Sequence, residues 1–440
     1  MNALLLCGGI GNRMRPFRED KFMLDVLGRP LLLHIVDMLR DAGIDSFIFV
    51  GNPGNVEELR SMVQGLDDLS CRVVAQEDRS GMAGAVEAAG EYLDGEVLVV
   101  SSNDVVEPAA YRKVVEVAET QTCDVALLAC KVGQYFPGGY LVTNAEMRVT
   151  RIEEKPKPGS EPSDLVNVVV HYHRDPLKLL EALTRVDTTR DDRHEMALDL
   201  MMREGRRVLA VPYVGFWSPL KYPWDIFPVM EHFVWGLRRR VSLGARVSSS
   251  AVIEGTVVLA DGVRVLENAV IRGPAYIGDN AIIGNNTLIR GGCHIGAGSV
   301  VGFSTEVKHS YIGRNCWFHS NYVGDSVIDD RCMFGSGAVT ANLRFDEGPV
   351  VVRIDGGSIV TGMDKLGVIM GQKCQVGINA SLMPGVLLGA GAVVGPHVCL
   401  TENLPPNHKA LSREAYRIVD MGDRTRGPAR EFMRHRLENV

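Results

Sequence analysis

The feature that most constrains the fold is an aliphatic residue at every sixth position from about residue 250 onward. The count holds over ten successive positions and, after an interruption, over six more, which an irregular globular arrangement of strands would not maintain. The positions are Ile253, Leu259, Val265, Ile271, Ile277, Ile283, Ile289, Ile295, Val301 and Val307, then Met370, Val376, Leu382, Leu388, Val394 and Leu400. Such hexapeptide repeats indicate a solenoid in which three hexapeptides close a triangular coil of about 18 residues, stacked at roughly 4.8 Å.

The repeat is broken in two places. Ile312 and Phe318 lie one residue early relative to the first frame, which marks a slip of the period. The segment 342–365, NLRFDEGPVVVRIDGGSIVTGMDK, lacks the period altogether. We expect this segment to be a loop thrown out of the solenoid.

The first half of the chain has a different pattern, in which short apolar runs such as SFIFVG and EVLVVSS alternate with helical stretches such as NVEELRSMVQGL. Strand and helix in alternation predict an α/β domain with a mostly parallel sheet, whose ligands lie at the carboxyl ends of the strands. We therefore expect an α/β domain over 1–230, a helical linker over 231–249, the solenoid over 250–405 and a polar tail over 406–440, in which LSREAYRIVD could pack.

Composition limits the class of protein further. The chain has 440 residues and a net charge of −7, which argues against a general nucleic-acid binder. The nine cysteines are scattered, and no apolar run approaches the roughly 18 residues of a membrane span. The histidines form no metal motif in the sequence, since Leu198 stands where HEMAL would need the second histidine of H-E-x-x-H. We expect a cytoplasmic protein with small-molecule substrates, and with neither nucleic acid nor membrane as a partner.

A glycine cluster ends the first apolar run, in LLLCGGIGNRMRP. Without a Cβ, such a turn lets backbone N–H groups approach phosphate oxygens, and Arg13, Arg15 and Lys21 could add cationic contacts. An ordinary strand-to-helix turn with surface arginines explains the glycines equally well on this stretch alone. The spacing fits neither a G-K-[ST] phosphate loop nor a G-x-G-x-x-G turn.

The whole stretch CGGIGNRMRPFREDKFMLDVLGRPLLLHIV resembles the sugar-1-phosphate nucleotidyltransferases, and their later motifs follow in order over residues 1–230. These are VVSSNDV, GGY, EEKP, LVNVVVHY and FWSPLKYPWDIF. The resemblance implies a Rossmann-like domain that joins a nucleoside triphosphate, by preference UTP, to a sugar-1-phosphate and releases pyrophosphate. DKFMLDVLGRPLL is also similar to the guanylyltransferases of molybdenum cofactor assembly, which lack the EKP and WD segments.

The same resemblance implies roles for individual residues. Arg13 and Lys21 would stabilise the transferring phosphoryl group, and Asp104 and Asp225 would hold Mg²⁺. Gln76 falls where the uridyl enzymes contact the base. The remaining assignments are nucleotide contacts at Leu6, Gly8, Gly9, Gly11 and Gly81, and sugar contacts at Gly139, Glu154, Lys155 and Asn167.

Several positions depart from this family's pattern and bear on substrate identity more than on reaction type. Asn12 stands where the family has threonine, and Met82 where a threonine commonly approaches the nucleotide. Asp20 and Phe22 replace the prolines of Pro-Lys-Pro. Val168-Val169 follow Asn167 where Ala-Gly is usual, which narrows the expected sugar pocket.

A second candidate site lies in the solenoid. Arg290 and Lys308 are 18 residues apart, so one coil stacks them about 5 Å from each other. Two cations so close repel unless an anion lies beside them. Spacing alone somewhat favours a solvated basic corner over a binding site.

The segments TEVKHS, FHSNYVGDS and GSGAVTANLRFDEG resemble the acetyltransferase half of the bifunctional glucosamine-1-phosphate acetyltransferase/N-acetylglucosamine-1-phosphate uridyltransferases, the archaeal type above all. The resemblance implies a left-handed parallel β-helix, a homotrimer with active sites between subunits, and acetyl-CoA as co-substrate. His319 would be the general base, Tyr322 and Asn342 substrate contacts, and Arg290 with Lys308 the grip on the sugar phosphate. Met333 stands where those enzymes have asparagine.

The leading hypothesis is thus a bifunctional enzyme that acetylates glucosamine-1-phosphate and joins the product to UTP. Two alternatives stay open: a glucose-1-phosphate thymidylyl- or uridylyltransferase whose acetyl transfer is weak or lost, and a non-catalytic regulatory subunit that binds nucleotide sugar and trimerises. The altered neighbourhood of Lys21 and Met333 favour the regulatory subunit slightly, whereas retention of Lys21, Asp104, Asp225 and His319 counts against it.

Overall fold

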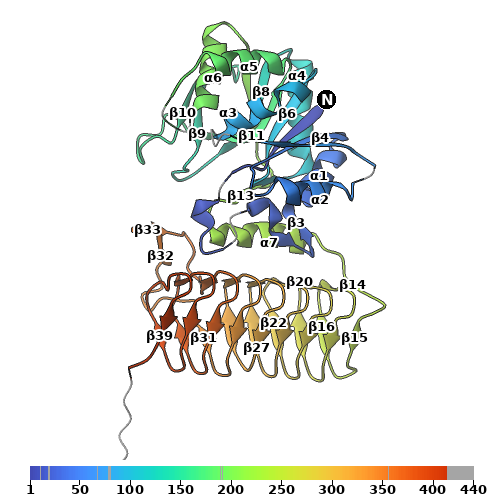
Figure 1. Cartoon of the computed structure of the whole chain (residues 1–440), viewed down its shortest axis with the longest axis vertical. Helices are drawn as coiled ribbons and strands as arrows, with labels where there is room; N and C mark the ends of the chain where they lie inside the picture. Colours follow the sequence, from blue (N-terminus) through green and yellow to red (C-terminus); the bar gives the residue numbers. More distant parts are fainter. Residues whose placement is uncertain are drawn as a thin grey trace, which may run out of the picture.

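A computed structural model describes residues 1–413 of the chain, apart from residues 10, 18–19, 67, 78–80, 189, 191 and 355. An N-terminal α/β domain rests on a long β-helix, with helix α7 (Ile226–Trp235) between the two (Figure 1). No helix in the described part of the chain is both long and apolar enough to cross a membrane.

The N-terminal domain is built on one nine-stranded sheet with the order β10-β9-β11-β6-β1-β4-β5, to which β8 and β12 are added beside β11. Its strands are β1 (Asn2–Leu6), β4 (Ser46–Gly51), β5 (Ser70–Ala75), β6 (Val97–Ser101), β8 (Val125–Lys131), β9 (Gly139–Thr143), β10 (Val149–Glu154), β11 (Leu165–His173) and β12 (Val208–Tyr213). Its helices are α1 (Leu31–Asp41), α2 (Val56–Val63), α3 (Gly81–Ala88), α4 (Pro108–Thr120), α5 (Pro176–Thr184) and α6 (Arg193–Arg203).

Strand direction changes within this sheet. β1, β4, β5 and β6 are parallel, as the alternation of strand and helix predicts. β11, however, is antiparallel to β6, β8 and β9, so the sheet is mixed rather than mostly parallel. Apolar runs show where strands lie but carry no information on their direction, which explains the difference.

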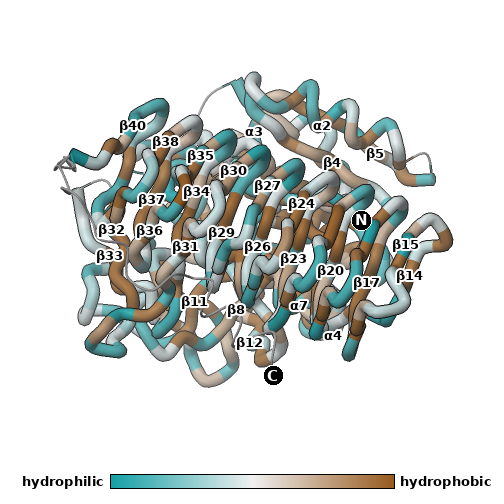
Figure 2. Tube along the Cα trace, turned by 90° about the horizontal axis from the view of Figure 1, so that it is seen from below, coloured by the Kyte–Doolittle hydropathy of each residue, from teal (hydrophilic) through white to brown (hydrophobic). Residues whose placement is uncertain are grey.

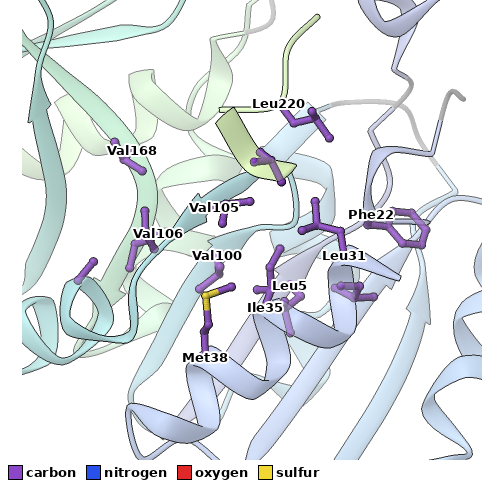
Figure 3. Packing of buried hydrophobic residues seen from close by; sticks show 14 of the residues in the cluster. Leu5, Phe22, Leu31, Ile35, Met38, Val100, Val105, Val106, Val168 and Leu220 are labelled. Atoms are coloured by element: carbon purple, nitrogen blue, oxygen red, sulfur yellow. The ribbon is translucent and has the colours of Figure 1, made fainter. Parts of the chain in front are cut away.

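Alternating residues of the strands feed two cores, one on each face of the sheet. On β1, Leu4 packs on the side of α3, α5 and α6, whereas Leu5 packs on the side of α1, α4 and α7. Figure 3 shows the second core, where Leu5 and Val100 face Ile35 and Met38 of α1. Two-sided burial explains why these strands read as unbroken apolar runs.

The C-terminal domain is the hexapeptide β-helix that the period predicts. Its three sheets run from β14 (Arg240–Val241) to β37 (Leu387–Leu388), from β15 (Arg246–Val247) to β40 (Lys409–Ala410), and from β16 (Val252–Glu254) to β39 (Cys399–Leu400). Ile271 pairs with Ile253 and with Ile289, so one coil is 18 residues. Figure 2 shows hydrophobic strand segments separated by hydrophilic turns along this domain.

The ends and slips of the β-helix refine the expected ranges. β14 already pairs with β17 (Val257–Leu259), so coils begin within the stretch expected as linker, and β40 carries them past residue 405. Ile312 pairs with Ile295 and Phe318 with Val301, each 17 residues on, which is the slip seen in the sequence. Most of LSREAYRIVD, from residue 414 onward, lies outside the described residues.

The segment 342–365 is not a plain loop. It contains a hairpin of β32 (Val351–Ile354) and β33 (Gly357–Val360) that rises from the β-helix toward the N-terminal domain (Figure 1). Val350 and Val352 are buried in the core that includes α1 and α7. The expectation of a loop was wrong because the absence of the six-residue period excludes a coil, not a strand.

A buried carboxylate joins the two domains. Asp25, in β2 (Asp25–Val26), is 2% exposed, and Arg314 of the β-helix donates from Nε to its Oδ2 at 2.6 Å. The Tyr311 hydroxyl donates to the backbone carbonyl of Asp25 at 2.9 Å. A shared core and a paired buried charge resist sliding of one domain over the other.

Candidate active sites

A cleft opens at the carboxyl ends of β1 and β6, where α/β sheets place ligands. It consists of a cavity of about 530 Å³ and a neighbouring one of about 770 Å³, which share Asn12, Ser101, Asn103 and Glu154 among their walls. Every N-terminal residue assigned from the sequence lines one or both cavities, except Asp225. Those residues are Leu6, Gly8, Gly9, Gly11, Arg13, Lys21, Gln76, Gly81, Asp104, Gly139, Glu154, Lys155 and Asn167.

The glycine-rich turn lies against the proposed base-reading residue. A Cβ at Gly8 would stand 2.9 Å from Oε1 of Gln76, so a larger residue there would displace this amide. The amide of Gln76 donates from Nε2 to the backbone carbonyl of Gly81 at 3.0 Å, and its side chain is buried. The turn therefore forms one wall together with the start of α3.

Cations gather at the other end of the turn. Arg13 lies in a short 3-10 helix (Asn12–Met14) and Lys21 in a second one (Lys21–Met23), and both line the smaller cavity. Burial lowers the pKa of Lys21, although the charges of Asp104 and Asp225 oppose this shift. A desolvated ammonium group is suited to meeting phosphate oxygens.

Asp104 faces the cleft from the first position of β7 (Asp104–Val106). The indole of Trp217 in β13 (Trp217–Pro219) donates to its Oδ1 at 3.0 Å. β7 and β13 pair antiparallel, with Pro219 directly opposite Asp104. The hydrogen bond holds the carboxylate in one orientation toward the cavity.

Asp225 is held differently from Asp104, and its role as a second metal ligand stays a prediction. Its Oδ2 accepts the backbone N–H groups of Lys221 and Tyr222, both at 2.7 Å, in a capping box at the start of a 3-10 helix (Pro223–Asp225). Burial raises the pKa of Asp225 to about 6, in spite of these two hydrogen bonds. Oδ2 is engaged by the backbone, while the charge of Asp225 acts on Lys21 and Lys221, which line the cleft.

Lys221 takes a place in the cleft that the sequence did not reveal. Its ammonium lies 3.6 Å from the centre of the Phe136 ring and donates to the carbonyl of Pro137 at 2.7 Å. Burial lowers its pKa to about 8, although Asp104 opposes the shift. Its position in SPLKYPWD, two residues past β13, was the available signal, but a lone lysine in a loop has no distinctive spacing.

The proposed sugar end is lined by residues of β9, β10 and β11. A Cβ at Gly139 would lie 3.0 Å from Oε2 of Glu154 and 3.6 Å from Cβ of Asn167, so the glycine brings these two side chains together. Lys155 pairs with Glu154 at 3.0 Å. Of the two valines after Asn167, Val169 lines both cavities, whereas Val168 packs into the core (Figure 3).

In the β-helix, four of the five predicted residues lie on one face. Arg290 of β22 (Leu288–Arg290) pairs in register with Lys308 of β25 (Glu306–Lys308), and Tyr322 begins β28 (Tyr322–Gly324) beside them. Carboxylates of this chain balance the charges of these two stacked cations. Lys308 donates to Asp325 at 2.6 Å and Arg290 donates to Glu306 at 2.8 Å.

Hydrogen bonds extend this group to the fourth residue. Asn342 donates from Nδ2 to the Tyr322 hydroxyl at 3.2 Å and also contacts Asp325. His319 is exposed at the corner between β27 (Trp317–Phe318) and β28, three residues before Tyr322. Met333, where an asparagine was expected, is 48% exposed and pairs with Trp317 on the adjoining face.

The fold and the cleft define a nucleotidyltransferase domain fused to a hexapeptide-repeat β-helix. The family model "MobA-like NTP transferase domain" matches residues 3–246, and the model "Bacterial transferase hexapeptide (six repeats)" matches residues 274–309. The chain belongs to the family of bifunctional sugar-1-phosphate nucleotidyltransferases/acetyltransferases, which confirms the resemblance drawn from the motifs.

Three relatives cover nearly the whole chain. "Bifunctional protein GlmU" of Methanococcus maripaludis (strain C7) is 35% identical over 92% of this chain and 95% of its own. "Bifunctional protein GlmU" of Methanocaldococcus jannaschii is 31% identical over 94% and 98%. "Bifunctional sugar-1-phosphate nucleotidylyltransferase/acetyltransferase" of Sulfurisphaera tokodaii is 29% identical over 90% and 96%.

Proposed function

We propose that the N-terminal cleft transfers a nucleotidyl group from UTP to N-acetylglucosamine-1-phosphate and releases pyrophosphate. The observation that carries this proposal is that residues scattered from Leu6 to Lys221 converge on one continuous cleft, in which cations, carboxylates and amides line the walls together. The full-length similarity to bifunctional sugar-1-phosphate enzymes supports the same reaction.

Within this cleft, the reaction needs positioning and charge stabilisation more than covalent chemistry. An oxygen of the sugar phosphate attacks the α-phosphorus in line, and the bond to the pyrophosphate oxygen breaks. Arg13, Lys21 and Lys221 would stabilise the charge that gathers on the phosphoryl oxygens. Asn167 and Glu154 would orient the sugar.

Asp104 is suited to hold Mg²⁺, because its carboxylate is fixed by Trp217 and faces the cleft. Magnesium is commonly held by one or two carboxylates and takes its remaining ligands from phosphates and water. When bound, the ion would neutralise phosphate charge as a Lewis acid. Asp225 would contribute less as a second ligand, since its Oδ2 already accepts two backbone N–H groups.

We further propose that the β-helix acetylates glucosamine-1-phosphate with acetyl-CoA. His319 would take a proton from the substrate ammonium, so that the free amine attacks the thioester carbonyl and the thiol of coenzyme A leaves. Arg290 and Lys308 would bind the phosphate, with Tyr322 and Asn342 beside the sugar. The exposure of His319 and its place next to Tyr322 in the chain support this assignment.

A homotrimer would complete this second site. Four apolar side chains on neighbouring coils of the face that contains β27 are each between 46% and 58% exposed, two of them on strands and two in the turns after strands. They are Phe303, Trp317, Met333 and Ile378. Such a strip is typical of a surface covered by another subunit, and His319 lies at its edge. Trp317→Glu should shift the native mass from trimer to monomer, and a monomeric wild type would contradict the proposal.

A substrate panel tests both activities together. Glucosamine-1-phosphate, N-acetylglucosamine-1-phosphate and glucose-1-phosphate are each offered with UTP or dTTP, with and without acetyl-CoA, while pyrophosphate and free thiol are followed. Thiol release with glucosamine-1-phosphate and pyrophosphate release with UTP and N-acetylglucosamine-1-phosphate support the proposal. Turnover of glucose-1-phosphate alone, or no turnover in any arm, would replace it with one of the two alternatives.

A further inference from the structure

We propose that His171, His173 and His194 form a buried binding site for a transition-metal ion of the zinc class, in the wall between the cleft and the core of the N-terminal domain. No sequence motif predicts this site, since His171 and His173 are in β11 whereas His194 is in α6. The site is separate from the magnesium position at Asp104, which offers the oxygen ligand that magnesium prefers.

Local structure brings the three side chains together. His171 and His173 are alternate residues of β11 and therefore share one face of the sheet. His194 is the second residue of α6, which packs on that face. One ligand atom from each histidine lies within 4.8 Å of the other two. Figure 1 shows α6 at the end of the domain far from the β-helix.

Five of the six ring nitrogens of this cluster lack a partner among the described residues. His171, His173 and His194 are 0%, 0% and 2% exposed. Among the described residues, no hydrogen-bond partner exists for Nδ1 of His171 or for either ring nitrogen of His173 and His194. Buried polar atoms are nearly always satisfied, so five unpaired nitrogens in one cluster point to a ligand.

Burial affects the protonation of the three histidine side chains. Burial lowers the pKa of His173 to about 3 and that of His194 to about 4, and it lowers the pKa of His171 as well. Burial thus disfavours the charged form of each imidazole, and the neutral form is the one that binds metals.

Asn167 prepares His171 as a ligand. Its Oδ1 lies 2.9 Å from Nε2 of His171, and a carbonyl oxygen can only accept, so Nε2 carries the proton. Nδ1 is thereby left with its lone pair free for a metal. A hydrogen bond of this kind to the second nitrogen commonly orients a metal-binding histidine. Asn167 also lines the cleft, so the metal site and the sugar end share one amide.

Some zinc sites have three histidine ligands and a water molecule in the fourth position. The three imidazole nitrogens of this cluster match that ligand set. Tetrahedral coordination at 2.0–2.1 Å requires nitrogens about 3.3 Å apart, so no pair has to close by more than about 1.5 Å. His194 lines the larger cavity, which supplies a route for the ion from the cleft. A bound ion would fix the His171–Asn167 pair and hold α6 to the sheet.

The test uses the full-length chain without a histidine tag, stripped with a chelator and titrated with Zn²⁺ and with Co²⁺. We expect one equivalent to bind, the melting temperature to rise, and Co²⁺ to give the absorption bands of tetrahedral nitrogen coordination without a thiolate charge-transfer band. The double variant His173→Gln, His194→Gln should lose all three effects. His408→Gln and Cys399→Ser serve as matched controls that remove another histidine and an exposed thiol.

Kinetics give a second readout. Loss of the ion should raise the KM for the sugar phosphate severalfold, through Asn167, with a smaller change in kcat. Absence of Co²⁺ bands in the wild type, a thiolate band, or unchanged binding in the double variant would each overturn the site. The wild-type spectrum decides the question even if the double variant does not fold. The metal titration measures binding and not turnover, so its failure can be distinguished from a failure of the proposed function.

Discussion

The indole nitrogen of Trp217 lies 3.0 Å from Oδ1 of Asp104 and donates a hydrogen bond to it. The bond spans two paired strands and turns the carboxylate toward the cleft. Asp225, only eight residues beyond Trp217, instead directs Oδ2 at backbone N–H groups of its own turn. Two aspartates with the same expected role therefore have different surroundings, and their variants should differ.

We expect Asp104→Asn to lower kcat/KM for nucleotidyl transfer by about 100-fold or more, because the amide cannot neutralise a cation that binds the phosphates. Asp225→Asn should stay within about tenfold of the wild type, because its carbonyl oxygen can still accept the two N–H groups. Steady-state rates over a magnesium titration measure both. An apparent magnesium affinity that falls equally in the two variants would show that Asp225 is as much a ligand as Asp104.

Lys221 supplies a separate prediction on pH dependence. With a pKa of about 8, its ammonium is protonated below pH 8 and increasingly neutral above it. We expect kcat/KM for nucleotidyl transfer to fall as the pH rises through about 8, and Lys221→Met to be lower at every pH. In Lys221→Arg the charge persists, so the fall near pH 8 should disappear.

Lys21→Arg is the control for this experiment, because burial also lowers the pKa of Lys21. If the fall near pH 8 survives in Lys221→Arg and vanishes in Lys21→Arg, the titrating group is Lys21 and the role given to Lys221 is wrong.

The sequence predicts those features of the structure that depend on a regular spacing or an ordered motif. The six-residue period defines the register of the β-helix residue by residue, since each coil repeats one packing requirement, as at Ile253 and Ile271. Glycines and cations in ordered motifs could likewise be assigned to the cleft, because a turn such as Gly8 has to be adjacent to its ligand.

Tertiary neighbours without a shared spacing could not be found this way. His194 reaches the two histidines of β11 across more than twenty residues, and Lys221 enters the cleft from a loop. The motif position of Asp225 likewise gives no information on the backbone N–H groups that donate to its Oδ2. The hairpin β32–β33 shows the same limit, since its burial depends on the other domain.

His319 can be tested by separating the two activities. We expect His319→Ala to abolish thiol release from acetyl-CoA with glucosamine-1-phosphate and to leave pyrophosphate release unchanged, because the two sites belong to different domains. A loss of about 100-fold or more is typical for a general base. His408→Ala, also exposed on the β-helix, is the matched control. Acetyl transfer near the wild-type rate in His319→Ala would exclude the histidine as the base.

His309 couples the domains through a charge that depends on pH. Its Nδ1 lies 2.8 Å from Asp325 and its Nε2 2.8 Å from Glu231 of α7, while the ring stacks on Phe227. Burial disfavours protonation of His309, but the two carboxylates outweigh it and raise its pKa to about 9. The stabilisation is therefore full below the unfolded pKa near 6.5 and is lost as the pH rises through about 9.

The rise in the pKa of His309 from 6.5 to about 9 corresponds to a free energy of at most about 3.5 kcal/mol, given about 1.4 kcal/mol per unit of pKa. We expect the melting temperature of the wild type to fall between pH 6.5 and pH 9 by more than that of His309→Gln. The comparison between the two proteins matters because Lys221, with a lowered pKa, contributes the opposite slope at higher pH. His408→Gln controls for the loss of an exposed histidine. Parallel melting curves for wild type and His309→Gln across this range would show that His309 does not hold the domains together.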